Sequence, residues 1–145
     1  MNSRLLLALQ IAAVAAIALG QGRASAEAIS LKVDLKGTSE VPPNPSKATG
    51  SLAISYDPAD KTLTWKGSYA GLSGPLTAAH FHGPAAVGKN AGITVSIAIG
   101  TTPGAIEGSA TISETQAADL LAGRWYVNLH TAANPAGEIR GQVLK

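Results

Sequence analysis

Cysteine is absent from the chain, and the single methionine stands at position 1. These absences exclude a disulfide, a thiolate zinc site, a cysteine-linked lipid anchor and a blue-copper centre, and they disfavour Cu(I). Stability must therefore come from packing and sheet hydrogen bonds, with a bound metal as the remaining support.

Aromatic residues make up only 4% of the chain, and Trp65 and Trp125 fall on apolar strand faces. A sugar-stacking platform is therefore not indicated, and both tryptophans are expected in the core. The 11 Lys+Arg include Arg4 and Arg23, which leaves 9 basic residues against 9 acidic ones in residues 27–145. A neutral domain has no basic field, so nucleic acid is not expected as a partner.

The N-terminal segment has the pattern of a secretory leader. Arg4 precedes an apolar run over residues 5–20, and Ala24-Ser25-Ala26 fits the small-x-small rule for signal peptidase. The alternative is a transmembrane anchor, but the run is short for a span of about 20 residues. We predict a signal peptide over residues 1–26, one domain over residues 27–145 with no membrane span, and a periplasmic or secreted location.

Alternation of apolar and polar residues dominates the rest of the chain, as in strands with one buried face. The pattern predicts an all-β fold, an antiparallel Greek-key β-sandwich of about eight strands with one short helix. Residues 40–46 are proline-rich and are expected to form an exposed, stiff loop. The strands are expected near residues 29–36, 51–56, 62–66, 76–82, 93–99, 105–112, 124–131 and 138–144, and the helix at 113–121.

The three histidines are confined to two strand-like segments. His80 and His82 form a His-x-His and project from the same strand face, while His130 lies in the other segment. All three are on faces opposite the expected core. Three imidazoles brought together would suit Zn²⁺ or Cu²⁺, so we predict them as metal ligands.

The last two predicted strands are close enough for a hairpin. If the turn is centred on Asn134, residues whose numbers sum to 268 face each other, so Asn128 opposes Arg140 and Tyr126 opposes Gln142. His130 would then oppose Glu138. Glu138 is therefore expected as a fourth ligand or as a hydrogen-bond acceptor for His130, with Asn128, Arg140 and Tyr126 orienting the site.

The same residues have an alternative interpretation. The imidazoles, Asn128, Glu138 and Arg140 could form a metal-free polar network that fixes neighbouring loops. A different chemistry is not indicated, because the chain has no Gly-x-Ser-x-Gly nucleophile elbow and no phosphate-binding glycine loop.

The chain resembles the chordin-type (CHRD) domain family. The resemblance rests on the opening segment Leu35-Lys-Gly-Thr-Ser-Glu-Val-Pro-Pro43 and on two histidine motifs. It implies a β-sandwich in an exported, single-domain protein of bacterial type, and it covers nearly all of the chain after the leader. The histidine motifs are Ala79-His-Phe-His-Gly-Pro-Ala85 and Tyr126-Val-Asn-Leu-His-Thr-Ala-Ala-Asn-Pro-Ala-Gly-Glu-Ile-Arg-Gly-Gln142.

A weaker likeness, at the level of the fold, is to copper–zinc superoxide dismutase. That family also holds copper with a His-x-His on a Greek-key strand. This chain departs from it because three histidines are too few for a bridged two-metal site. We therefore expect one copper or zinc ion, bound or carried rather than used in catalysis. The alternatives are a structural or interaction module with an unknown protein partner, and a small superoxide-dismutase-like metalloprotein.

Overall fold

The computed structural model describes residues 26–145, so the predicted signal peptide, apart from Ala26, lies outside the described residues. Eight antiparallel strands and one short helix confirm the predicted all-β architecture. The described residues contain no helix that is long and apolar enough to cross a membrane. The elements are β1 (Ile29–Lys36), η1 (Gly37–Ser39), β2 (Thr49–Asp57), β3 (Thr62–Ala70), β4 (Leu76–His82), β5 (Ile93–Ile97), β6 (Ala105–Thr111), α1 (Glu114–Leu121), β7 (Tyr126–Thr131) and β8 (Ile139–Gln142).

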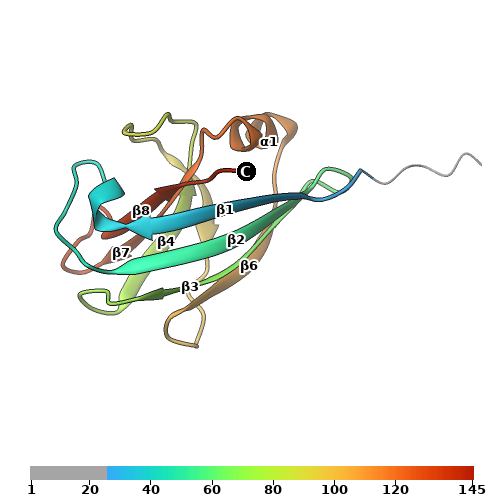
Figure 1. Cartoon of the computed structure of the whole chain (residues 1–145). Helices are drawn as coiled ribbons and strands as arrows, with labels where there is room; N and C mark the ends of the chain where they lie inside the picture. Colours follow the sequence, from blue (N-terminus) through green and yellow to red (C-terminus); the bar gives the residue numbers. More distant parts are fainter. Residues whose placement is uncertain (1–25) are drawn as a thin grey trace, which may run out of the picture.

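The strands form one sheet in the order β5-β4-β7-β8-β1-β2-β3-β6, which is folded so that its two halves face each other (Figure 1). The halves are joined where β1 meets β8, through the pair Lys36 and Arg140 and a bridge from Lys32 to Leu144. Across the interior, the ring of Trp65 on β3 meets that of Phe81 on β4, with centroids 5.1 Å apart. The sandwich is therefore a single sheet that is nearly closed on itself.

Strand alternation fills the interior, as the sequence pattern predicts. On β1, Leu31, Val33 and Leu35 are buried, and the residues between them are exposed. The largest buried side chains include Phe81 and Trp125, which pack against each other with ring centroids 5.9 Å apart. Burial of apolar side chains of this size supplies most of the driving force for folding.

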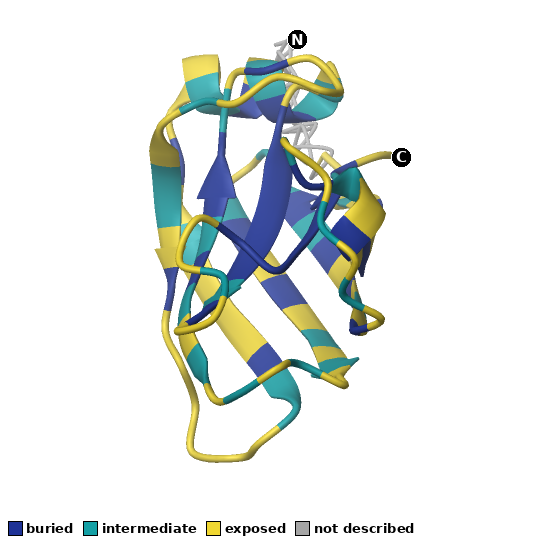
Figure 2. Cartoon of the chain, turned by 90° about the vertical axis from the view of Figure 1, so that its left-hand side faces the viewer, coloured by how far each residue is buried: buried dark blue, intermediate teal, exposed yellow. Residues whose placement is uncertain are grey.

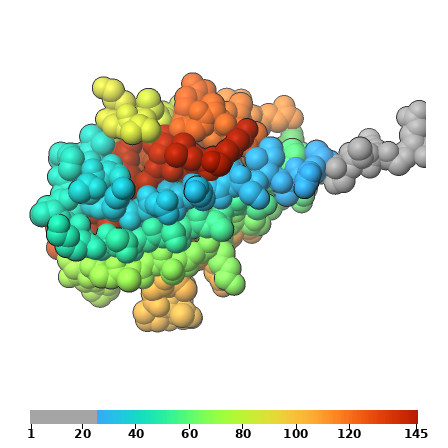
Figure 3. Space-filling model, in the orientation of Figure 1, coloured from blue at the N-terminus to red at the C-terminus, as the bar shows by residue number. Residues whose placement is uncertain are grey.

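Strand β7 departs from the one-sided pattern, because all its residues except His130 are buried (dark blue in Figure 2). Its outer face is covered by the connecting loops. Arg140 on β8 donates to the side-chain oxygen of Asn90 and to the carbonyl of Lys89, and Asn90 in turn donates to the carbonyl of Val41. In the space-filling view, β8 lies in dark red between β1 in blue and the loop of residues 83–92 in yellow (Figure 3).

The expectation of an exposed loop at residues 40–46 is wrong at its first residue. Glu40 is only 5% exposed, although Pro42, Pro43 and Pro45 are exposed. The prolines project into solvent, whereas Glu40 still belongs to the turn that follows β1, where the backbone N–H of Glu40 donates to the carbonyl of Gly37. This turn directs the Glu40 side chain inward.

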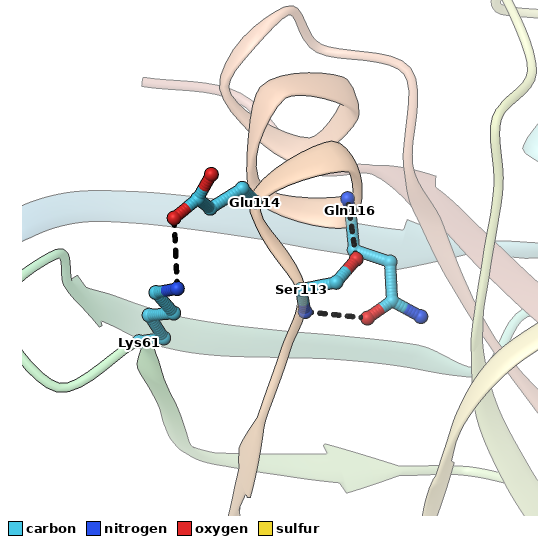
Figure 4. A network of polar contacts seen from close by, with 4 residues as sticks. All are labelled: Lys61, Ser113, Glu114 and Gln116. Atoms are coloured by element: carbon cyan, nitrogen blue, oxygen red, sulfur yellow. Dashed lines mark hydrogen bonds and ion pairs between the residues drawn. The ribbon is translucent and has the colours of Figure 1, made fainter.

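The helix begins where its capping residues predict. Ser113 is the N-cap, its hydroxyl accepts from the backbone N–H of Gln116, and the Gln116 side chain accepts from the backbone N–H of Ser113 (Figure 4). This capping box satisfies two backbone donors at the first turn. An exposed ion pair of 2.8 Å between Lys61 and Glu114 adds little, because both charges face solvent. Leu120 anchors the helix to the core.

Candidate metal centre

The structure brings the three histidines together on the outer face of β4 and β7. His80 pairs in register with Asn128, so His130, two residues further along β7, lies diagonally across from His80. The Nδ1 of His80 is 3.2 Å from the Nε2 of His130. One ligand nitrogen from each of the three histidines lies within 4.8 Å of the others.

His130 is oriented by a backbone carbonyl. Its Nδ1 is 3.0 Å from the carbonyl oxygen of Pro135, and because a carbonyl only accepts, this nitrogen carries the proton. The lone pair of Nε2 then faces His80. Two imidazole nitrogens 3.2 Å apart can share one ion, since each zinc–nitrogen bond is about 2.0–2.1 Å long.

His82 is the most buried of the three, with 9% of its surface exposed. Its Nδ1 is 3.0 Å from the carbonyl oxygen of Ala91, and its Nε2 is 3.0 Å from Oδ1 of Asn128. Asn128 is the register partner of His80 and precedes His130 by two residues, so Nε2 is the nitrogen on the side of the other histidines. An ion at this site would replace the contact between Nε2 and Asn128.

The environment keeps two of the imidazoles neutral. Burial lowers the pKa of His80, and the neighbouring His130 and His82 lower it further. Burial also lowers the pKa of His82, and hydrogen bonds to Ala91 and Asn128 offset only part of this effect. Neutral imidazole is the form that binds metals, so both side chains have the charge state that a metal site requires at neutral pH.

Tyr126 and Arg140 support His82 from one side. The rings of His82 and Tyr126 are stacked, with centroids 4.8 Å apart and an interplanar angle of 3°. The guanidinium of Arg140 lies 3.4 Å from the centre of the Tyr126 ring. Because β4 and β8 flank β7, the Tyr126 ring lies between His82 and Arg140. The Tyr126 hydroxyl also contacts the backbone of Ala91 and so holds the covering loop.

The hairpin register is confirmed where both strands are regular: Asn128 faces Arg140, and Tyr126 faces Gln142. It does not extend to Glu138. Gly137 has a φ of +131°, and the backbone N–H of Glu138 donates to the carbonyl of Leu129, which shifts the pairing by one residue. A shift of one residue directs a side chain to the opposite face of a strand.

Glu138 consequently lies in a polar cluster of its own. Its carboxylate accepts hydrogen bonds from the hydroxyls of Ser46, Ser73 and Thr131, at 2.6–2.8 Å, and from the backbone N–H of Ser73 at 2.9 Å. It is not among the side chains whose ligand atoms converge with the histidines. The structure thus corrects the expected contact between Glu138 and His130.

Glu40 is the residue near the site that sequence reasoning missed. It is buried, and its Oε1 has no hydrogen-bond partner. Burial raises its pKa to about 7, against the opposing effects of Arg140 and the side chain of Asn128. Its position at the start of a proline-rich loop suggests solvent exposure, and no local pattern signals that it lies beside Asn128.

Comparison with known proteins supports the fold. Residues 31–143 match the family model described as the CHRD domain, and the match includes all three histidines. No curated protein and no solved structure matches the chain.

Proposed function

Because the chain belongs to the CHRD domain family, we propose that this β-sandwich domain binds one divalent metal ion, copper or zinc, through His80, His82 and His130. The observation that carries the proposal is the 3.2 Å approach of His80 Nδ1 to His130 Nε2, with the tautomer of His130 set by Pro135. A backbone carbonyl that orients a histidine in this way is typical of metal sites.

Three imidazoles leave a fourth coordination position open. Copper is favoured by the general order of affinities, and zinc is favoured by its indifference to geometry. The domain would bind or carry the ion. Glu138 is not needed for binding, because its carboxylate is already occupied by hydroxyl and amide donors.

Calorimetric titration with Zn²⁺ and, separately, Cu²⁺ tests the proposal. The wild-type protein should bind one ion per chain, and a variant with all three histidines changed to alanine should not. Glu138→Gln is the matched control and should keep the wild-type affinity. Equal binding by the wild type and the triple variant would eliminate the metal site.

A second candidate is a metal-free interaction module. It is favoured by the two oxygen contacts of His82, which already form a polar network, and by a cleft of about 490 Å³ beside it. The cleft lies between Val41 and Val87, with Glu40 and Arg140 among its lining residues, and it would take a protein partner. In this case, neither metal would bind in the titration above.

We further propose that the chain is exported and that its leader is removed before Glu27, as the segment ending in Ala24-Ser25-Ala26 suggests. Mass spectrometry of the protein recovered from the producing cells tests this. An intact N-terminus at Met1 in the exported fraction would contradict the cleavage site.

A further inference from the structure

Three side chains form a chain of contacts from the interior to the histidine cluster. The carboxyl of Glu40 lies beside the side-chain amide of Asn128, and the other end of that amide meets Nε2 of His82 at 3.0 Å. Glu40 lies near the start of the domain sequence and His82 near its middle, and no hydrogen bond joins the two side chains. Asn128 is the connection between them.

The side chains of Glu40 and Asn128 both lie next to Gly137. A Cβ atom at this glycine would lie 2.4 Å from Oε1 of Glu40 and 2.6 Å from Nδ2 of Asn128. The carboxyl oxygen and the amide nitrogen therefore share the space that a side chain at Gly137 would fill. The nitrogen end of the amide is thus directed toward Glu40 and toward the carbonyl of Ala136, to which it donates at 3.4 Å, and the oxygen end toward His82.

This orientation has a consequence for His82. With Oδ1 of Asn128 at its Nε2 and the carbonyl of Ala91 at its Nδ1, both ring nitrogens face acceptors. Neutral imidazole has only one N–H, so both contacts cannot be hydrogen bonds at once. If the amide turned, Nδ2 would donate to Nε2, and the N–H at Nδ1 would donate to Ala91, which satisfies both contacts.

We propose that Glu40 is a positioning residue that, through Asn128, determines which nitrogen of His82 carries the proton. The carboxylate attracts the amide N–H groups of Asn128 more strongly than the neutral carbonyl of Ala136 does, since that contact is long at 3.4 Å. The carboxylate so presents Oδ1 to His82, which favours the proton on Nε2. Metal binding at Nε2 needs the proton on Nδ1 instead. Glu40 therefore restrains the third ligand and lowers the affinity of the site.

The metal-free protein tests the proposal directly, independently of whether any metal binds. Long-range ¹H–¹⁵N NMR at pH 8.5, above the pKa of about 7 for Glu40, identifies the protonated ring nitrogen of each histidine. Wild-type His82 should be protonated at Nε2, and Glu40→Gln should move the proton to Nδ1. The same tautomer of His82 in both proteins would overturn the proposal.

Asn128→Ala provides a second variant if Glu40→Gln does not fold. Without the amide, only Ala91 remains as a partner, so the proton of His82 should lie on Nδ1 whatever residue occupies position 40. Persistence of the Nε2 proton in this variant would also overturn the proposal. Lys89→Ala is the control and should keep the wild-type tautomer of His82. This substitution keeps the backbone carbonyl of residue 89, which accepts a hydrogen bond from Arg140.

The effect on affinity rests on the proposed function and is measured separately. Glu40→Gln should bind Zn²⁺ more tightly, by about 10-fold, which is the scale on which residues behind metal ligands act. The gain should vanish in the Asn128→Ala background. No zinc binding by the wild type would refute the metal site alone, whereas an unchanged tautomer would refute the role of Glu40.

Discussion

Replacement of Glu138 by glutamine should remove a large, charge-dependent part of the stability. Burial raises the pKa of Glu138, but hydrogen bonds from Thr131, Ser73 and Ser46 together outweigh this and lower it to about 2. A carboxyl group with a pKa of 4.5 in the unfolded chain and about 2 in the folded one contributes roughly 3 kcal/mol at pH 7.

The sign of the pH dependence follows from these values. Between pH 4.5 and about 2, the unfolded chain binds more protons than the folded chain at this position, so stability rises with pH across this window. The contribution of Glu138 is fully present above pH 4.5 and falls to about 0.4 kcal/mol at pH 2. The deficit of Glu138→Gln relative to wild type should shrink in parallel.

Urea denaturation at a series of pH values from 2 to 7 measures the stability of Glu138→Gln relative to wild type. Unfolding is followed by the fluorescence of Trp65 and Trp125, which are both buried. Glu107→Gln, at an exposed position on β6, is the control and should show no comparable loss. A deficit for Glu138→Gln that stays constant from pH 2 to 5 would show that neutral packing, and not the ionised carboxylate, stabilises the cluster.

Four further outcomes are expected. Thermal denaturation should show stabilisation of about 2.7 kcal/mol at a Zn²⁺ concentration 100 times the dissociation constant, and no shift would contradict a preformed site. Because the pKa values of His80 and His82 are lowered from 6.5, zinc affinity in Glu40→Gln, which lacks the titrating carboxyl, should stay level at pH 7–8 and fall only in more acid solution, as calorimetry at pH 5–8 would show. Gly137→Ala should cost about 1–3 kcal/mol in urea denaturation because its φ is +131° and its Cβ would meet Glu40, whereas Gly74→Ala, with open space around it, should be nearly neutral. Phe81→Ala should cost about 3–5 kcal/mol by the same assay, and a smaller effect would mean that the core collapses around the gap.

The fold was predictable because its signals are local. Strand alternation and the capping pair Ser113 and Gln116 each lie within a few residues, and the hairpin register at Asn128 and Arg140 follows from the turn length. The pairing of His80 and His82 on one face is equally local, since neighbouring side chains of a strand alternate between its two faces.

The remaining features of the site depend on contacts between distant segments. Glu40 and Asn128 are separated by most of the domain, and their meeting requires the fold of the complete sheet. The displacement of Glu138 depends on the conformation of Gly137, and an extended pattern of residues does not reveal a φ of +131°. The approach of His80 to His130 likewise required the neighbouring placement of β4 and β7, which periodicity alone does not specify.

The double burial of β7 has a consequence for how this protein can vary. Odd-numbered positions such as Val127 and Leu129 are constrained by volume, whereas even-numbered ones such as Tyr126 and Asn128 are constrained by hydrogen-bond geometry. Substitution at the even positions can therefore alter the polar contacts around the histidines without opening a cavity in the hydrophobic interior. A one-residue insertion within the strand would turn every following side chain to the opposite face, so polar residues would enter the core and apolar ones would leave it. This segment can therefore accept new side chains but not a new length.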